Sequence, residues 1–135
     1  MTRGLKPHLK PTGKALVKSP KAPAWFTPEA KGEWKRIMPL LIERKILTEA
    51  DMGSVENYCI AIGQVREMQA LISKEGAIAM GTHGPRAHPA IRVQSDAMTR
   101  ARLLASELGL TPVSRSRPSV RDDEKGDDDS DLGDI

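Results

Sequence analysis

Hydrophobic residues fall at helical spacing in three stretches of the chain, and each stretch has its own start and stop signals. The first begins at Thr27, which can cap a helix, with Pro28 at the first helical position. Its apolar stripe is Ala30, Trp34, Ile37, Met38 and Leu41. Pro39 lies inside this stretch and removes the hydrogen bond to Lys35, so we expect a kink there or a new short helix after it.

The second stretch predicts a long central helix that runs from Thr48 to about residue 75. Thr48 and Asp51 form a start that resembles a capping box, and Gly76 follows as a stop signal. About 28 residues at 1.5 Å each give a helix of about 42 Å, which is longer than the first helix can cover. We therefore expect its stripe to contact a second copy of the chain. The candidate interface residues are Met52, Val55, Cys59, Ile62 and Val65.

The third stretch follows a change of character at residues 77–88, where glycine and proline favour a short hairpin or an ordered loop. A third helix is predicted from His88-Pro89, and Gly109, Leu110 and Pro112 end it as in a Schellman motif. Its apolar positions are Ala90, Val93, Ala97, Ala101, Leu104, Ala105 and Leu108. The whole pattern predicts a mainly α protein: helix, long central helix, short hairpin or loop, third helix.

Charge divides the rest of the chain into two unlike ends around this helical domain, residues 27–112. Residues 1–26 contain four prolines and no acid, and residues 122–135 contain eight acids and one lysine. The net charge of +3 therefore hides +6 at one end and −7 at the other. Because both ends lack the apolar content that would order them, we expect a flexible basic arm over 1–26. Over 113–135 we expect an arginine-containing linker and a disordered acidic tail.

These charges indicate which partners the chain can bind. A basic arm suits phosphates, and an acidic tail suits a basic protein surface or the chain's own arm, unless either only confers solubility. Arginines of the third helix either face DNA or simply solvate the helix. The candidate DNA-binding residues are Arg3, Lys6, Lys10, Lys14, Lys18, Lys21, Arg92, Arg100, Arg102, Arg115 and Arg117. The candidate partner-binding residues of the tail are Asp127, Asp128, Asp129 and Asp131.

The sequence offers no set of residues that would make an active site. Gly13-Lys14 lacks both the following Ser/Thr and the earlier glycine of a phosphate-binding loop. The three histidines and Cys59 have no metal-ligand spacing, and Cys59 lies on an apolar stripe as a small hydrophobe would. We expect no catalytic residue, metal or cofactor. A single cysteine, no secretory signal and no run long enough to span a bilayer indicate a soluble cytosolic protein.

Several short motifs occur in an order that resembles a known family. They include Glu33-Trp34, Leu47-Thr48-Glu49-Ala50-Asp51, Tyr58-Cys59 and the run from Glu107 to Arg115, Glu-Leu-Gly-Leu-Thr-Pro-Val-Ser-Arg. Together they resemble the small terminase subunit of tailed bacteriophages, whose hallmark is the Leu-Gly-Leu-Thr-Pro-x-Ser-Arg signature. The resemblance covers about residues 3–117. One departure is His88, where the family more often has Asn, and both residues can cap a helix.

The resemblance implies a non-enzymatic DNA-packaging factor that acts in the host cytoplasm. Such proteins assemble into rings, recognise the packaging start on double-stranded phage DNA, and recruit and regulate a large subunit that holds the ATPase and nuclease. The alternative class is a dimeric transcriptional regulator of a phage, in which the two helices joined through residues 44–47 form a helix-turn-helix. A structural adaptor of the phage particle is a third possibility.

Overall fold

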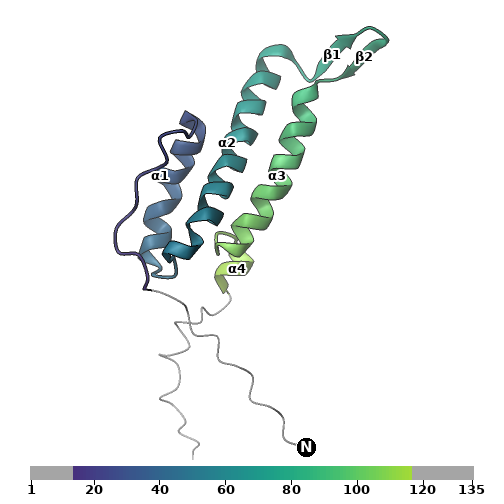
Figure 1. Cartoon of the computed structure of the whole chain (residues 1–135). Coiled ribbons are helices and arrows are strands. Elements are labelled where there is room, and N and C mark those ends of the chain that lie inside the picture. Colours follow the sequence, from purple (N-terminus) through teal and green to yellow (C-terminus); the bar gives the residue numbers. More distant parts are fainter. Residues whose placement is uncertain (1–13, 117–135) are drawn as a thin grey trace, which may run out of the picture.

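A computed structural model of the chain describes residues 14–116. In chain order its elements are α1 (Pro28–Glu43), the 3₁₀ turn η1 (Glu49–Asp51), α2 (Met52–Glu75), β1 (Ile78–Gly81), β2 (Gly84–Ala87), α3 (Pro89–Glu107) and α4 (Pro112–Ser116). Both α1 and α3 pack on α2, which lies between them (Figure 1). The hairpin of β1 and β2 projects beyond the end of α2 and α3. The predicted mainly α class and the predicted hairpin are both confirmed.

Helix α1 begins and packs as its sequence predicts. The Thr27 hydroxyl accepts a hydrogen bond from the Ala30 N–H at 3.3 Å, and all five stripe residues are buried. No new helix begins at Pro39, because α1 continues through it to Glu43. Pro39 and Lys35 are exposed, so the carbonyl that loses its usual donor lies on the outer side of the helix.

Helix α2 approaches α1 closely at a glycine. The predicted capping box is present, with the Thr48 N–H donating to Asp51 Oδ2 at 2.8 Å, and the first turn it starts is the 3₁₀ turn η1. Farther along, a Cβ built on Gly63 would lie 3.1 Å from the Ala30 nitrogen. The helix ends at Gly76, whose φ of +90° suits glycine.

Helix α3 packs on α2 through small side chains. His88 caps it, since its Nδ1 accepts from the Ala90 N–H at 3.0 Å while its Nε2 bonds to Glu75 at the end of α2. The buried positions are Ala90, Gln94, Ala97 and Ala101. The prediction that Val93 lies on the buried face is wrong, because that side chain is 45% exposed. Gln94 takes the buried place and donates to the Val65 carbonyl at 3.2 Å and to Gln69 at 2.9 Å.

The end of α3 has the predicted Schellman geometry. The Leu110 N–H donates to the Ala105 carbonyl at 2.8 Å, and the Gly109 N–H donates to the Ser106 carbonyl at 3.2 Å. Residues 112–116 then form α4, although the sequence placed most of them in a linker. The physical reason is a reciprocal cap, in which the Thr111 N–H donates to Ser114 Oγ at 3.0 Å and the Ser114 N–H donates to Thr111 Oγ1 at 3.2 Å.

Residues 14–26 lie along the helices, in contrast to the flexible arm predicted for 1–26. The Leu16 N–H donates to the Leu47 carbonyl at 2.8 Å, and the Trp34 indole N–H donates to the Pro20 carbonyl at 2.9 Å. The Phe26 ring is buried edge-on to Trp34, with centroids 5.8 Å apart. The segment packs on the helices because Leu16, Ala22 and Phe26 contact the core. The prolines and lysines between them give this stretch of sequence the composition of a flexible arm.

Candidate nucleic-acid interface

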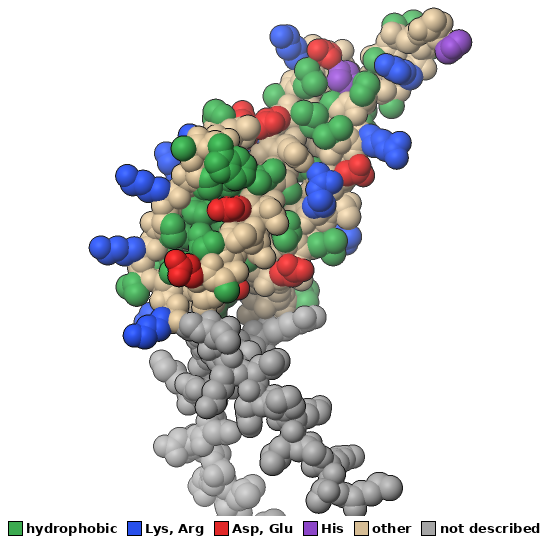
Figure 2. Space-filling model, viewed as in Figure 1, with side chains coloured by type: hydrophobic (Ala, Val, Ile, Leu, Met, Phe, Trp, Pro, Cys, Tyr) green, Lys and Arg blue, Asp and Glu red, His purple; other side chains and the backbone are tan. Residues whose placement is uncertain are grey.

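Exposed cations gather on the outer edge of the molecule formed by α1 and the segment 14–26 (Figure 2). Lys14, Lys18 and Lys21 are all exposed on that segment. Lys31 and Lys35, one helical turn apart on α1, add to the same edge. These two lysines were not among the candidates named from the sequence, although their i, i+4 spacing beside the buried stripe was the available signal.

The segment and α1 enclose a groove between them on this basic edge. The groove has a volume of about 390 Å³. Its lining residues are Ser19, Pro20, Lys21, Ala22, Trp34, Lys35, Met38 and Pro39. Lys21 and Lys35 therefore border the same groove from different elements, above a largely apolar lining. We call this the Trp34 groove.

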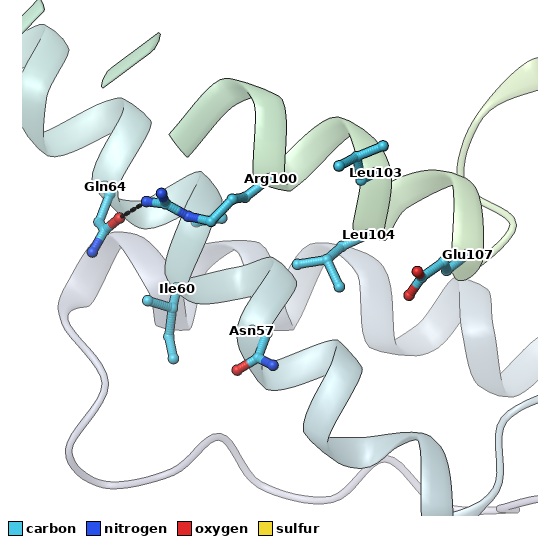
Figure 3. A pocket seen from close by; sticks show the side chains of 8 residues that line it. Asn57, Ile60, Gln64, Arg100, Leu103, Leu104 and Glu107 are labelled. Atoms are coloured by element: carbon cyan, nitrogen blue, oxygen red, sulfur yellow. Dashed lines mark hydrogen bonds between the residues drawn. The ribbon is translucent and has the colours of Figure 1, made fainter. Parts of the chain in front are cut away.

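The candidate arginines of α3 do not form one face. Arg92, Arg100 and Arg102 are all exposed, but Arg100 and Arg102 lie two residues apart and so point to roughly opposite sides of the helix. Arg100 donates to Gln64 Oε1 on α2 at 3.0 Å (Figure 3). Arg115 lies on α4 and donates to the Thr111 carbonyl at 3.4 Å. The α1 edge is therefore the denser group of cations among residues 14–116.

Other candidates fall outside the described residues. These are the DNA-binding candidates Arg3, Lys6, Lys10 and Arg117 and the tail candidates Asp127, Asp128, Asp129 and Asp131.

The predicted interface residues of α2 occupy two different environments. Val55 and Cys59 are fully buried in the chain's own core, where they leave no surface for a second copy. Met52, Ile62 and Val65 are half-buried. The buried pair packs inside because α1 and α3 together cover more of α2 than the first helix alone could.

Apolar surface remains exposed elsewhere on α2, α3 and the hairpin. A groove of about 410 Å³ between α2 and α3 holds Ile60, Leu103 and Leu104 beside polar residues such as Glu107 (Figure 3). On the hairpin, Ile78 pairs with Ala87 and Met80 with Pro85, so one face of the ribbon carries four apolar residues. Ile78 is 63% exposed and Met80 is 78% exposed. These two apolar surfaces are therefore candidates for contact with another molecule.

A buried carboxylate joins α1 to α2 behind the basic edge. Glu33 is 1% exposed and bonds to Arg36 on its own helix. The Tyr58 hydroxyl donates to Glu33 at 3.4 Å, and Arg66 lies 3.6 Å away. The hydrogen bond to Glu33 raises the pKa of Arg36, and burial, followed by the Glu33 charge, raises the pKa of Tyr58. The cluster joins α1 to α2, and no buried side-chain nitrogen or oxygen among the described residues lacks a hydrogen-bond partner.

Cys59 is held next to this cluster as a neutral thiol. Burial, with the Glu33 charge as the next cause, raises its pKa to about 12. A thiol with that pKa is a poor nucleophile near neutral pH, because only the thiolate attacks. Among residues 14–116, no three His, Cys, Asp or Glu side chains lie close enough together to hold a metal ion.

A comparison with known families decides the identity of the chain. The family model described as "Phage terminase, small subunit" matches residues 30–125, which is more than half of the sequence. The chain belongs to the phage terminase small subunit family. Membership supports a role in phage DNA packaging. No curated protein and no solved structure matches the chain. No helix within residues 14–116 is long and apolar enough to cross a membrane.

The motifs that resemble the terminase family have clear structural tasks here. Glu33 and Tyr58, which lie 25 residues apart, meet in one hydrogen bond between α1 and α2. In the Leu-Gly-Leu-Thr-Pro run, Gly109 supplies the positive φ of the helix stop and Thr111 caps the next helix. Arg44 at the end of α1 donates to the Gly109 carbonyl. The signature therefore ties the end of α3 to the end of α1.

Proposed function

We propose that this terminase small subunit binds double-stranded phage DNA at the packaging start and brings the large subunit, with its ATPase and nuclease, to that DNA. The observation that carries the DNA part is the row of exposed lysines on the α1 edge. Lysines arranged in this way bind phosphates as point charges and hold the protein on the duplex without reading its sequence. The protein would act in the host cytoplasm and hold no active site of its own.

The lysine side chains explain why binding depends on the edge as a whole. Lys14 and Lys18 are exposed and Lys31 is half-buried, and none of the three carries a hydrogen bond or ion pair that would have to break before DNA binds. By contrast, Arg36 is already bonded to Glu33, so less of its charge is available to a phosphate. Each lysine that neutralises a phosphate releases counterions and lowers affinity at high salt.

The protein would work as a homo-oligomer, which we propose is a ring. The exposed apolar faces of the hairpin and of the α2–α3 groove are the surfaces available for contact between copies. They lie toward different ends of the α2–α3 pair, as a heterologous contact between unlike surfaces requires. If the rotation between neighbours closes, such contacts generate a ring rather than a filament.

The fold does not favour the alternative of a dimeric helix-turn-helix regulator. A recognition helix has to leave one face free to enter the major groove. Helix α2 would be that helix, but it packs on both α1 and α3 and has 24 residues. The α1–α2 pair is therefore better described as a packing hairpin.

The proposal is tested by the salt dependence of DNA binding. We expect replacement of Lys14, Lys18 and Lys31 by Gln to reduce the slope of log affinity against log salt by about 3, because three phosphate contacts are lost. A matched variant that replaces Lys74, Arg92 and Arg102 removes the same charge elsewhere and should leave the slope nearly unchanged. The opposite ranking of the two variants would place the DNA on the surface of α2 and α3 that carries these three cations and refute the proposed edge.

A further inference from the structure

The Trp34 groove has features that neither DNA packaging nor the fold requires. Its lining is mostly apolar, with Trp34 and Met38 at its floor and Pro39 at its rim. Because proline has no N–H, the Lys35 carbonyl at this groove lacks its usual helical donor and can accept a hydrogen bond from a docked peptide. Lys21 and Lys35 border the apolar lining. This combination suits an acidic peptide that also carries aliphatic side chains.

The chain itself contains such a peptide. Residues 122–135 carry eight acids and one lysine, and Leu132 and Ile135 stand among the aspartates. Phosphodiester backbone, by comparison, offers charge but no aliphatic group for an apolar groove. The tail therefore matches both properties of the groove, whereas DNA matches only one.

The geometry places the start of this tail within reach of the groove. Arg44 directly follows Glu43, the last residue of α1, and donates a hydrogen bond to the Gly109 carbonyl. The end of α1 therefore lies beside the loop that leads into α4. Lys35 is eight residues back along α1, or about 12 Å from its end. Leu132 lies sixteen positions after Ser116, and a chain of that length spans up to about 50 Å when extended. This reach is about four times the 12 Å that separates the end of α1 from Lys35.

We propose that the acidic tail of this chain, residues 122–135, docks in the Trp34 groove of the same chain. Its aspartates lie against Lys21 and Lys35, and Leu132 packs on the apolar lining. The docked tail covers cations of the α1 edge and competes with DNA for them. Full-length protein with a neutral tail should therefore bind DNA more tightly, most clearly at low salt, where screening is weakest.

A zero-length crosslinking experiment on the full chain, without DNA, tests the proposal. Carbodiimide joins a lysine amine to a carboxylate that lies against it, and peptide mapping identifies the pairs. We expect crosslinks from Lys21 and Lys35 to acids of 122–135, and few from Lys74, which is exposed at the far end of α2. Equal yields at Lys74 would overturn the proposal, as would tail crosslinks found only between isotopically distinct copies of the chain.

Matched variants separate groove docking from a general attraction of opposite charges. Replacing Lys21 and Lys35 by Gln should weaken docking roughly two- to five-fold for each lysine, and replacing Lys18 and Lys31 should weaken it less. Replacing Leu132 and Ile135 by Ser leaves the charge unchanged and should still lower the yield of crosslinks. An unchanged yield in that variant would show that the groove does not bind the tail. The experiment contains no DNA, so its failure is distinguishable from failure of the proposed DNA edge.

Discussion

Two glycines of the same helix should respond differently to replacement by alanine. Glycine in a helix interior costs about 1 kcal/mol relative to alanine, which applies in full to Gly63 and sets an upper limit for Gly53 in the first turn of α2. At Gly53 an added Cβ meets no atom within 4 Å, so the gain in stability should be realised. At Gly63 the same Cβ lies 3.1 Å from the Ala30 nitrogen and 3.2 Å from its Cβ, and α1 has to move.

The first turn of α1 has little freedom to make that movement. The Ala30 N–H bonds to the Thr27 hydroxyl, and Phe26, just before the helix, is buried against Trp34. Overpacking of this kind costs about 1–3 kcal/mol, which exceeds the propensity gain or matches it. We therefore expect Gly63→Ala to be neutral or destabilising by up to about 2 kcal/mol, and Gly53→Ala to be stabilising by up to about 1 kcal/mol.

Thermal and urea unfolding at a fixed protein concentration measure the difference. For a domain of about 100 residues, 1 kcal/mol shifts Tm by roughly 4–8 °C. Gly53→Ala should raise Tm and Gly63→Ala should leave it unchanged or lower it. If Gly63→Ala stabilised the protein as much as Gly53→Ala, the close α1–α2 contact would be refuted.

Two further predictions follow from the buried cluster at the α1–α2 contact. Because the pKa of Cys59 is raised to about 12, the folded chain keeps the thiol neutral where the unfolded chain ionises it. Ionisation of the unfolded thiol therefore lowers the free energy of unfolding as pH rises from about 9, the ordinary pKa, toward 12, and has no effect below pH 9. Urea unfolding should show that the free energy of unfolding is lower by about 1 kcal/mol at pH 10, and this decrease should be absent in Cys59→Ala. Replacing Glu33 by Gln keeps the shape but removes the charge, and should cost about 1–2 kcal/mol in the same assay. It should also lower the pKa of Cys59, which thiol titration would detect; an unchanged pKa would contradict the contribution of Glu33.

Local signals in the sequence predicted the helices well because each signal acts within a few residues. Thr27 with Pro28, the Thr48 capping box and the Schellman stop at Gly109 all appear in the structure. The error at Val93 has a different origin. Helical spacing alone does not show which of two neighbouring positions at the edge of a stripe is buried. Gln94 is buried against α2 because its amide donates hydrogen bonds to Val65 and Gln69.

Contacts between distant segments were the part that the sequence could not supply. Leu16 and Phe26 lie among prolines and lysines in the sequence. The segment packs on the helices because Leu16 bonds to the Leu47 carbonyl and both side chains contact the hydrophobic core. The buried Glu33 is a similar case, because its partner Tyr58 comes from another helix. For the site, the sequence named Lys14, Lys18 and Lys21 as DNA-binding candidates, which stays a prediction, and it gave no sign that Lys21 and Lys35 border one groove.

The measurement that bears most directly on the packaging role is the native mass of the purified full-length protein. Each chain contributes 14.8 kDa. A packaging subunit whose hairpin and groove surfaces meet between copies should give one dominant closed assembly of more than two chains, and addition of double-stranded DNA should shift its mass. A monomer at every concentration tested would contradict the ring. A dimer would also contradict it and would favour the alternative of a dimeric transcriptional regulator.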